Sequence, residues 1–124
     1  MKYFMLLPLL FLISCASSGI MVLSDQNNNS EVTLTSGERI KIELTSNPST
    51  GYQWILSSVD EDVLQQIGES DFEQETGLLG APQRQIFMFK TINSGSTNLI
   101  LYYLRPWESE QSPQDTFQVK FIVR

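Results

Sequence analysis

Hydrophobic and polar residues alternate along much of this chain, with the period of two that is typical of β-strands buried on one face. The alternation is clear over residues 31–35 and 39–44, where valine, isoleucine and leucine occupy every second position. The Ser-Gly-Glu sequence at residues 36–38 is a turn signal between them. We therefore predict that the two segments form a β-hairpin with one buried face.

Further strands are predicted toward the C-terminus. Residues 52–56 alternate again, residues 97–104 are rich in leucine, isoleucine and tyrosine, and residues 116–123 place phenylalanine or valine at every second position. Residues 84–92 are apolar on both faces, which predicts a central strand that is covered on both sides.

The connections help to define the fold. Residues 59–67 fit either a short strand or a helical turn, and residues 68–83 are expected to form a long polar connection. Six to eight short strands joined by turns predict an all-β protein, an Ig-like antiparallel β-sandwich in a single domain. The chain lacks the Cys…Trp…Cys framework of antibody domains, so we expect a domain that is Ig-like in shape but is not of the antibody type.

The composition excludes several kinds of protein. The 124 residues include no histidine and one cysteine, so there is no Ser-His-Asp or Cys-His catalytic pair, no imidazole metal ligand, no intramolecular disulfide and no multi-thiolate zinc site. A net charge of −6 argues against binding to nucleic acid. A hydrophobic fraction of 41% with 18% charged residues is compatible with a packed core.

Carboxylates remain as candidates for catalysis or metal binding. Acidic residues cluster at 60–62 and 69–75, but their spacing matches no EF-hand loop, and we interpret them as solvated loop charges. We therefore expect that the protein is not an enzyme and has no metal site and no cofactor.

The first 15 residues have the pattern of a bacterial lipoprotein signal peptide. Lys2 supplies a positive charge, and residues 4–13 form an apolar run. A membrane-spanning helix needs about 20 residues, so this run is too short to form one. The run ends in Leu-Ile-Ser-Cys, which resembles a lipobox in which the thiol of Cys15 receives diacylglycerol. The alternative is an ordinary exported protein in which Cys15 lies near the cleavage site by coincidence.

These features divide the chain into three parts: a signal peptide at 1–14, a lipidated cysteine with a flexible tether at 15–30, and a folded domain at 31–124. As an alternative to a tether along the whole of this segment, residues 20–23 could form a first edge strand. By resemblance to Gram-negative lipoproteins, Ala16 after the cysteine favours sorting to the outer membrane. We therefore expect a lipid-anchored protein of the cell envelope.

Two loops carry distinctive residues. Residues 47–54 read NPSTGYQW, in which Pro48 fixes its own φ and Gly51 permits conformations that a side chain would block. Trp54 is expected in the core, and Tyr52 at the base of the loop. Another distinctive loop follows the strand at 97–104 and contains Arg105, Pro106 and Trp107. The alternatives are a plain surface turn for residues 47–51 and, for Trp107, a side chain that folds back on the domain as a hydrophobic plug.

The string NPSTGYQW closely resembles the NPTTGY/F signature of the chagasin family, which are inhibitors of papain-like cysteine peptidases. The preceding VTLTSGERIKIEL resembles the lead-in of that family, and residues 105–107 match its RPW motif. That family also has a Gly-rich motif before a strand that is matched here by QIFMFK. This chain matches the motif at Gly80, with Pro82 and Gln83 where further glycines are expected. The resemblance covers residues 31–124.

The resemblance implies a reversible inhibitor whose three loops form a wedge that enters the active-site cleft of the peptidase. The first loop would cover the catalytic cysteine, with Thr50 and Gly51 nearest to it, and the other two would grip the walls of the cleft. The implied peptidase-binding residues are Asn47, Pro48, Ser49, Thr50, Gly51, Tyr52, Gly80, Pro82, Arg105, Pro106 and Trp107.

The expected partners are therefore a papain-like cysteine peptidase and, through the lipid, a membrane, with no nucleic acid. A monomer is the expected state. The competing hypothesis is a non-inhibitory envelope lipoprotein, a binding module of the same fold, which the altered Gly-rich motif keeps open.

Overall fold

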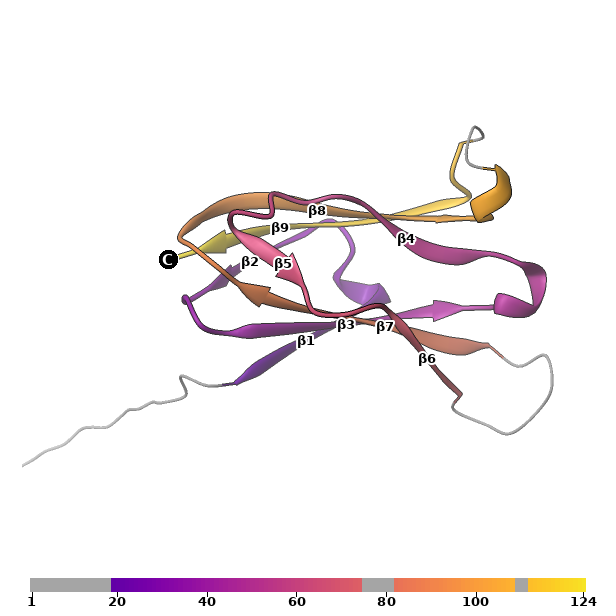
Figure 1. Cartoon of the computed structure of the whole chain (residues 1–124), viewed down its shortest axis with the longest axis horizontal. Coiled ribbons are helices and arrows are strands. Elements are labelled where there is room, and N and C mark those ends of the chain that lie inside the picture. The colour runs from indigo at the N-terminus through magenta and orange to yellow at the C-terminus, as the bar shows by residue number, and fades with distance from the viewer. Residues whose placement is uncertain (1–18, 75–81, 109–111) are drawn as a thin grey trace, which may run out of the picture.

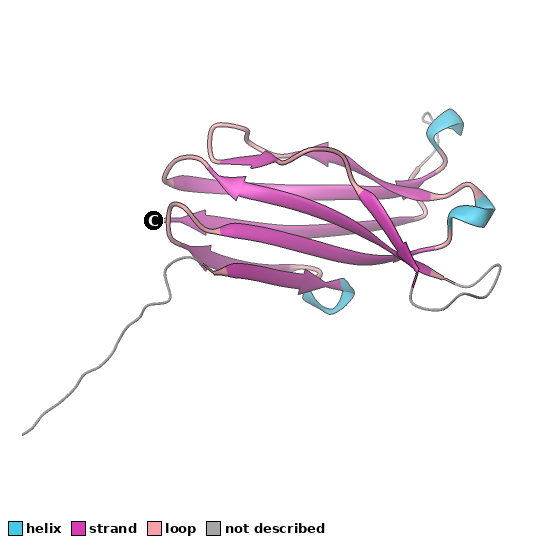
Figure 2. Ribbon diagram, turned by 60° about the horizontal axis from the view of Figure 1, so that its bottom comes forward, coloured by secondary structure: helices cyan, strands magenta, loops and turns pink. Residues whose placement is uncertain are grey.

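The computed structural model describes residues 19–74, 82–108 and 112–124. Two β-sheets pack face to face around one hydrophobic core (Figure 1; Figure 2). Sheet A has the order β1 (Ile20–Ser24), β3 (Arg39–Ser46), β7 (Gln83–Thr91) and β5 (Leu64–Gln66), with β6 (Asp71–Gln74) also paired to β7. Sheet B has the order β2 (Ser30–Leu34), β9 (Asp115–Val123), β8 (Gly95–Leu104) and β4 (Gln53–Ser58).

This arrangement confirms the predicted all-β, Ig-like sandwich. The pairings are antiparallel except for two at sheet edges, β1 with β3 and β2 with β9, which are parallel. The described residues form nine strands rather than six to eight. One strand that the sequence did not indicate is β6, which lies in the predicted polar connection. All four residues of β6 are exposed, so it leaves no hydrophobic alternation in the sequence.

Three single 3₁₀ turns complete the described elements: η2 (Asp25–Asn27), η3 (Pro48–Thr50) and η4 (Pro106–Glu108). In the ranges that the structure describes, no helix is both long enough and apolar enough to span a membrane.

The core is formed by alternate residues of both sheets, as the period of two predicts. Trp54 is buried, as expected from its place on a strand. The buried cluster consists of Leu23, Leu34, Ile40, Ile42, Leu44, Trp54, Val63, Leu64, Phe87, Phe89, Leu99, Leu101, Phe117, Val119, Phe121 and Val123. Each side chain of this size contributes about 1.5–3 kcal/mol on full burial. A chain that begins at Ala16 retains every residue of this cluster.

The predicted hairpin of residues 31–35 and 39–44 is wrong. The first segment, β2, pairs with β9 in sheet B, whereas the second, β3, pairs with β1 and β7 in sheet A. The turn between them crosses from one sheet to the other and is bonded to both. The Ser36 amide donates to the carbonyl oxygen of Arg124 at 3.1 Å. The Gly37 amide donates to the Thr91 hydroxyl at 2.7 Å.

The segment at 16–30 is not a tether throughout. Residues 20–24 form β1, which is the edge-strand alternative, and Leu23 is buried in the core. The turn η2 follows directly, and the Asp25 carboxylate accepts a hydrogen bond from the Thr45 hydroxyl at 2.8 Å. The folded domain therefore includes residues from Ile20 onward and does not begin at residue 31. Cys15 lies outside the described residues.

The other strand predictions are confirmed with small shifts of boundary. Residues 59–67 contain both of the alternatives. The amides of Val63 and Leu64 each donate to the carbonyl oxygen of Asp60 at 3.0 Å and close a single turn, and the short strand β5 follows directly. The central strand is β7, which is bonded to β3 on one side and to β5 and β6 on the other. The face of β7 that points away from the core is only partly covered, because Ile86 is buried there but Met88 is half-buried.

Candidate functional site

The strands that flank three connections reach the same end of the sandwich, opposite the C-terminus (Figure 1). Ser46 at the end of β3 is the register partner of Gln83 at the start of β7. Leu104 at the end of β8 is the partner of Gln53 at the start of β4. These strand ends are therefore the points at which three connections begin or end. We call the connections the first, second and third loops: residues 47–52, the connection that ends at Pro82, and residues 105–108.

The first loop is a compact turn closed by its own hydrogen bonds, with η3 at its centre. The Thr50 amide donates to the carbonyl oxygen of Asn47 at 3.1 Å, and the Gly51 amide to that of Pro48 at 2.9 Å. The hydroxyls of Ser49 and Thr50 donate to Asn47 Oδ1 at 2.6 Å and to its carbonyl oxygen at 2.7 Å. Because Pro48 also fixes its own φ, the loop is shaped before any partner binds.

Gly51 ends the first loop with a φ of 88°, in the left-handed region that glycine adopts without strain. It also makes room for Trp107, since a Cβ on Gly51 would lie 2.6 Å from the indole atom Cη2. Trp107 nevertheless remains 70% exposed. The indole therefore packs over the glycine and presents the rest of its surface to solvent, and it is not a hydrophobic plug.

Arg105 joins the third loop to the first. Its Nε donates to the carbonyl oxygen of Thr50 at 3.1 Å, and its guanidinium carbon lies 4.6 Å from the centroid of the Tyr52 ring. Its Nη1 lies 3.7 Å from Oε2 of Glu108 in η4, the turn that carries Trp107. A planar guanidinium can satisfy a carbonyl, a ring face and a carboxylate together, which an ammonium group cannot.

Tyr103, which the sequence did not single out, supports the first loop from β8. The Asn47 amide donates to the Tyr103 hydroxyl at 3.0 Å. The Tyr103 ring stacks on that of Tyr52, with centroids 5.4 Å apart, and lies 5.0 Å from that of Trp54. Tyr52 thus lies at the loop base, as predicted. The sequence pattern did offer a signal for this inward position, because Tyr103 lies two residues after Leu101 and four after Leu99, on the same face of the strand as these buried residues.

Gln85 is a second residue that the sequence analysis missed. It lies on β7 of sheet A, yet its fully buried amide reaches across the core to the edge strand β4 of sheet B. The Trp54 amide donates to Gln85 Oε1 at 2.8 Å, and Gln85 Nε2 donates to the carbonyl oxygen of Trp54 at 2.9 Å and to the Ser70 hydroxyl at 3.0 Å. The side chain therefore takes the place of a neighbouring strand and fixes β4 just after the first loop. The signal available in the sequence was a glutamine within the segment 84–92, which was predicted to be a strand covered on both sides.

The second loop is described only at its end. Pro82 is exposed and directly precedes β7. The pairing of Gln74 with Gln83 shows that β6 and β7 are the strands that this loop connects. Gly80 lies outside the described residues, so its predicted role stays a prediction.

The structure therefore brings most of the predicted site residues to one end of the sandwich. The first and third loops are in direct contact there, and Pro82 lies at the start of a neighbouring strand. The residues so placed are Asn47, Pro48, Ser49, Thr50, Gly51, Tyr52, Pro82, Arg105, Pro106 and Trp107.

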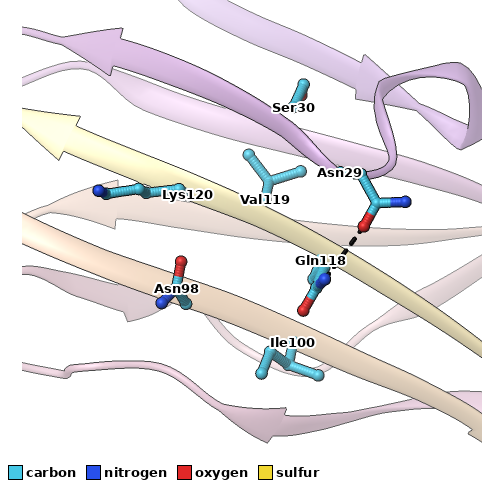
Figure 3. A pocket seen from close by; sticks show the side chains of 7 residues that line it. All are labelled: Asn29, Ser30, Asn98, Ile100, Gln118, Val119 and Lys120. Atoms are coloured by element: carbon cyan, nitrogen blue, oxygen red, sulfur yellow. Dashed lines mark hydrogen bonds between the residues drawn. The ribbon is translucent and has the colours of Figure 1, made fainter.

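A separate pocket of about 290 Å³ lies on sheet B and does not include any loop residue named above (Figure 3). Its lining residues are Asn29, Ser30, Asn98, Ile100, Gln118, Val119 and Lys120. Gln118 Nε2 donates to Asn29 Oδ1 at 3.0 Å, and the Gln118 backbone amide donates to Asn28 Oδ1 at 2.9 Å. These bonds attach the two residues that precede β2 to β9, so Asn29 and Gln118 in the polar lining have a structural role.

Comparison with known proteins identifies a matching family. Residues 33–121 match the family described as Chagasin family peptidase inhibitor I42. Amoebiasin-2 of Entamoeba histolytica is 29% identical over 117 residues, which are 92% of this chain and 95% of that protein. Chagasin of Trypanosoma cruzi is 29% identical over 98 residues, which are 75% of this chain and 88% of chagasin.

Solved structures share the fold. The crystal structure of EhICP2, a cysteine protease inhibitor from Entamoeba histolytica, matches with a TM-score of 0.78 and 25% identity over 89% of this chain and 100% of that one. PbICP-C, solved in complex with falcipain-2, matches with a TM-score of 0.56 and 22% identity over 88% of this chain and 100% of that one.

The family match runs from β2 to β9 and includes the first and third loops. These loops also carry the residues on which the resemblance in sequence depends. The chain therefore belongs to the chagasin family of peptidase inhibitors, I42.

Proposed function

We propose that this protein is a reversible inhibitor of papain-like cysteine peptidases that inserts the first, second and third loops into the active-site cleft. The observation that carries this proposal is the direct contact between the first and third loops, through the Arg105–Thr50 hydrogen bond and the packing of Trp107 over Gly51. Membership of an inhibitor family favours this function over that of a non-inhibitory binding module, and over any enzyme activity.

The first loop is suited to occupying a cleft without being cleaved. A peptidase attacks a peptide bond that is presented in an extended conformation, whereas residues 48–50 form a 3₁₀ turn. Thr50 and Gly51 lie at the end of this turn, and we place them nearest to the catalytic cysteine. Because the described loops offer no histidine or cysteine nucleophile, the complex depends on non-covalent contacts and is reversible.

The third loop supplies the largest apolar contact. Trp107 is the most exposed of the large hydrophobic residues in the described part of the chain, and tryptophan and arginine are the residue types enriched among binding hot spots. Its position is fixed by Gly51 and by η4, so little rotamer entropy is lost on docking. In this proposal Trp107 and Arg105 contact one wall of the cleft, and the second loop, with Gly80 and Pro82, contacts the other.

The direct test is titration of residues 16–124 against papain and a cathepsin L-type enzyme. Saturable inhibition that is reversed by dilution, with the inhibitor recovered uncleaved, is the expected result. The non-inhibitory binding module would be favoured by a different result. A correctly folded sample would then leave both enzymes fully active, and it would not bind to papain or the cathepsin L-type enzyme when the active site of that enzyme is blocked.

We further propose that the domain is a monomer attached to the cell envelope through lipid on Cys15, at the outer membrane of a Gram-negative bacterium. The support is the pattern of residues 1–15, together with the position of β1, which begins at the end of the sandwich opposite the loops. A lipid at the N-terminus then leaves the loops free to meet a peptidase.

Metabolic labelling with a fatty acid in a bacterial host tests the anchor. The full chain should incorporate label and fractionate with membranes, and Cys15→Ser should do neither. Labelling of the Cys15→Ser variant, or release of the unmodified protein into the medium, would instead support the ordinary export pathway.

A further inference from the structure

The outer face of sheet A carries an unusual group of side chains at the end where the chain enters the fold. Ile20 and Val22 of β1 are 52% and 55% exposed, although both are aliphatic. Their inward-facing neighbour Leu23 is buried, so the strand is oriented by the core and presents these two side chains outward.

Three cations share this face with the two aliphatic residues. In the strand register Ile20 is paired with Arg39 and Val22 with Lys41, and Arg39 is in turn paired with Lys90 on β7. Paired residues of neighbouring strands project to the same side of a sheet. We call the five residues Ile20, Val22, Arg39, Lys41 and Lys90 the β1 patch.

The β1 patch is positively charged, whereas the chain as a whole is negatively charged. It contains three of the eight lysine and arginine residues in a protein of net charge −6. Glu43 lies on the same face, 3.2 Å from Lys41 Nζ, but it is also 3.1 Å from Arg84 Nη1, so its charge is shared between two cations. Arg39 and Lys90 are both exposed.

We infer that the β1 patch is a lipid-contact surface, which lies against an anionic phospholipid bilayer. Cations next to exposed aliphatic side chains are the combination that binds such surfaces, through headgroup phosphates and shallow burial of apolar groups. The patch begins at Ile20, five residues after Cys15 in the sequence, so the inference extends the proposed lipid anchor. A lipid chain and a basic apolar surface would then act together.

This contact would set the orientation of the domain. Sheet A would face the bilayer, and sheet B, whose strand β8 leads directly into Arg105, would face away from it. The first and third loops lie at the opposite end of the sandwich from the start of β1 (Figure 1). They would therefore stay accessible to a peptidase while the patch is occupied.

The other occupant to consider is a second copy of this chain. β1 is an edge strand that is paired only with β3 among the described strands, and its five residues carry no charge and no proline. Such an edge can pair with another strand. The three cations favour the bilayer, since strand pairing makes no use of them.

The test is co-sedimentation of residues 16–124, which lack the lipid, with vesicles of phosphatidylglycerol and phosphatidylcholine in equal amounts or of phosphatidylcholine alone. We expect binding to the anionic vesicles that weakens as salt is added, and little binding to the neutral ones. Replacing Arg39, Lys41 and Lys90 by glutamine should lower the partition coefficient about fivefold for each cation removed. Replacing Ile20 and Val22 by serine should lower it while preserving its salt dependence.

The matched control is Lys120→Gln, which removes one cation from β9 of sheet B and should leave vesicle binding unchanged. Equal binding to both kinds of vesicle, or an undiminished partition coefficient in the glutamine variant, would overturn the inference. So would a concentration-dependent dimer that Val22→Lys abolishes, which would assign β1 to a second copy. Thermal unfolding checks that each variant is folded.

Peptidase titration of the same samples separates this inference from the proposed function. Inhibition should be the same for the parent and the glutamine variant in the absence of vesicles. Inhibition without vesicle binding would refute only the lipid-contact surface, whereas vesicle binding without inhibition would refute only the proposed inhibitory function.

Discussion

The Tyr103 hydroxyl accepts a hydrogen bond from the Asn47 backbone amide at 3.0 Å and so attaches the first loop to the end of β8. Because Arg105 follows two residues later on the same chain and bonds to Thr50, the first and third loops are held as one unit. The recognition surface is therefore shaped by a few polar contacts at the rim of an otherwise apolar sandwich.

Tyr103→Phe removes this hydrogen bond but retains the ring that stacks on Tyr52. We expect a loss of about 0.5–1.5 kcal/mol of free energy of unfolding. We also expect a roughly two- to tenfold rise in the inhibition constant, because the loop is less well ordered before docking. Urea unfolding and enzyme titration measure the two effects. Tyr102→Phe is the matched control, and an effect of equal size in both variants would contradict the role of Tyr103.

Gly51→Ala tests the packing of Trp107 over the first loop. The new methyl group would meet Trp107 Cη2 at 2.6 Å and would also strain a backbone with a φ of 88°. Gly37→Ala has comparable strain, with a φ of 97°, but nothing within 4 Å of its Cβ. Both variants should lose about 1–2 kcal/mol of stability, whereas only Gly51→Ala should weaken inhibition strongly. If Gly37→Ala weakens inhibition as much, strain alone explains the result.

Trp107→Ala removes the exposed indole of the third loop. We expect the inhibition constant to rise by about 30-fold or more, which corresponds to a hot spot of about 2 kcal/mol. Because Trp107 is 70% exposed, the free energy of unfolding should change by less than about 0.5 kcal/mol. Val22→Ala, at the opposite end of the sandwich, should leave inhibition unchanged. An unaltered inhibition constant in Trp107→Ala would refute the role given to the indole.

Arg105→Lys keeps the charge but removes the planar guanidinium. We expect at least a fivefold loss of inhibition, since lysine cannot bond to Thr50, lie over Tyr52 and reach Glu108 at once. Arg124→Lys is the control for the same exchange elsewhere. Inhibition equal to that of the parent protein would mean that only the positive charge of Arg105 matters.

Gln85→Leu tests the amide that fixes β4. The variant leaves the amide and carbonyl of Trp54 without the partners at 2.8 and 2.9 Å. We expect a loss of at least about 2 kcal/mol of free energy of unfolding, because each orphaned buried group costs about 1–3 kcal/mol. Gln65→Leu, at an exposed position of β5, should change stability little. Denaturant unfolding compares the two, and similar midpoints would show that water replaces the Gln85 amide.

Much of the fold could be predicted because burial on one face of a strand imposes a period of two on the sequence. The strands β3, β8 and β9 were predicted in this way, as was the burial of Trp54. The strand β6 could not be predicted, because all its side chains are exposed and only its backbone is paired. The loops were identified through their local sequence, since proline restricts the backbone and glycine permits left-handed conformations wherever they occur.

The sequence by itself determined the all-β class, the main strands and the identity of the first and third loops, because these depend on periodicity and on local backbone chemistry. The tertiary structure alone decided that β2 and β3 lie in different sheets, because hydrogen bonding to Arg124 and Thr91 makes the turn between them cross the sandwich. It also decided that Trp107 is exposed over Gly51 and that Gln85 reaches β4. Contacts between residues this far apart in the chain depend on how the two sheets pack, which no local pattern records.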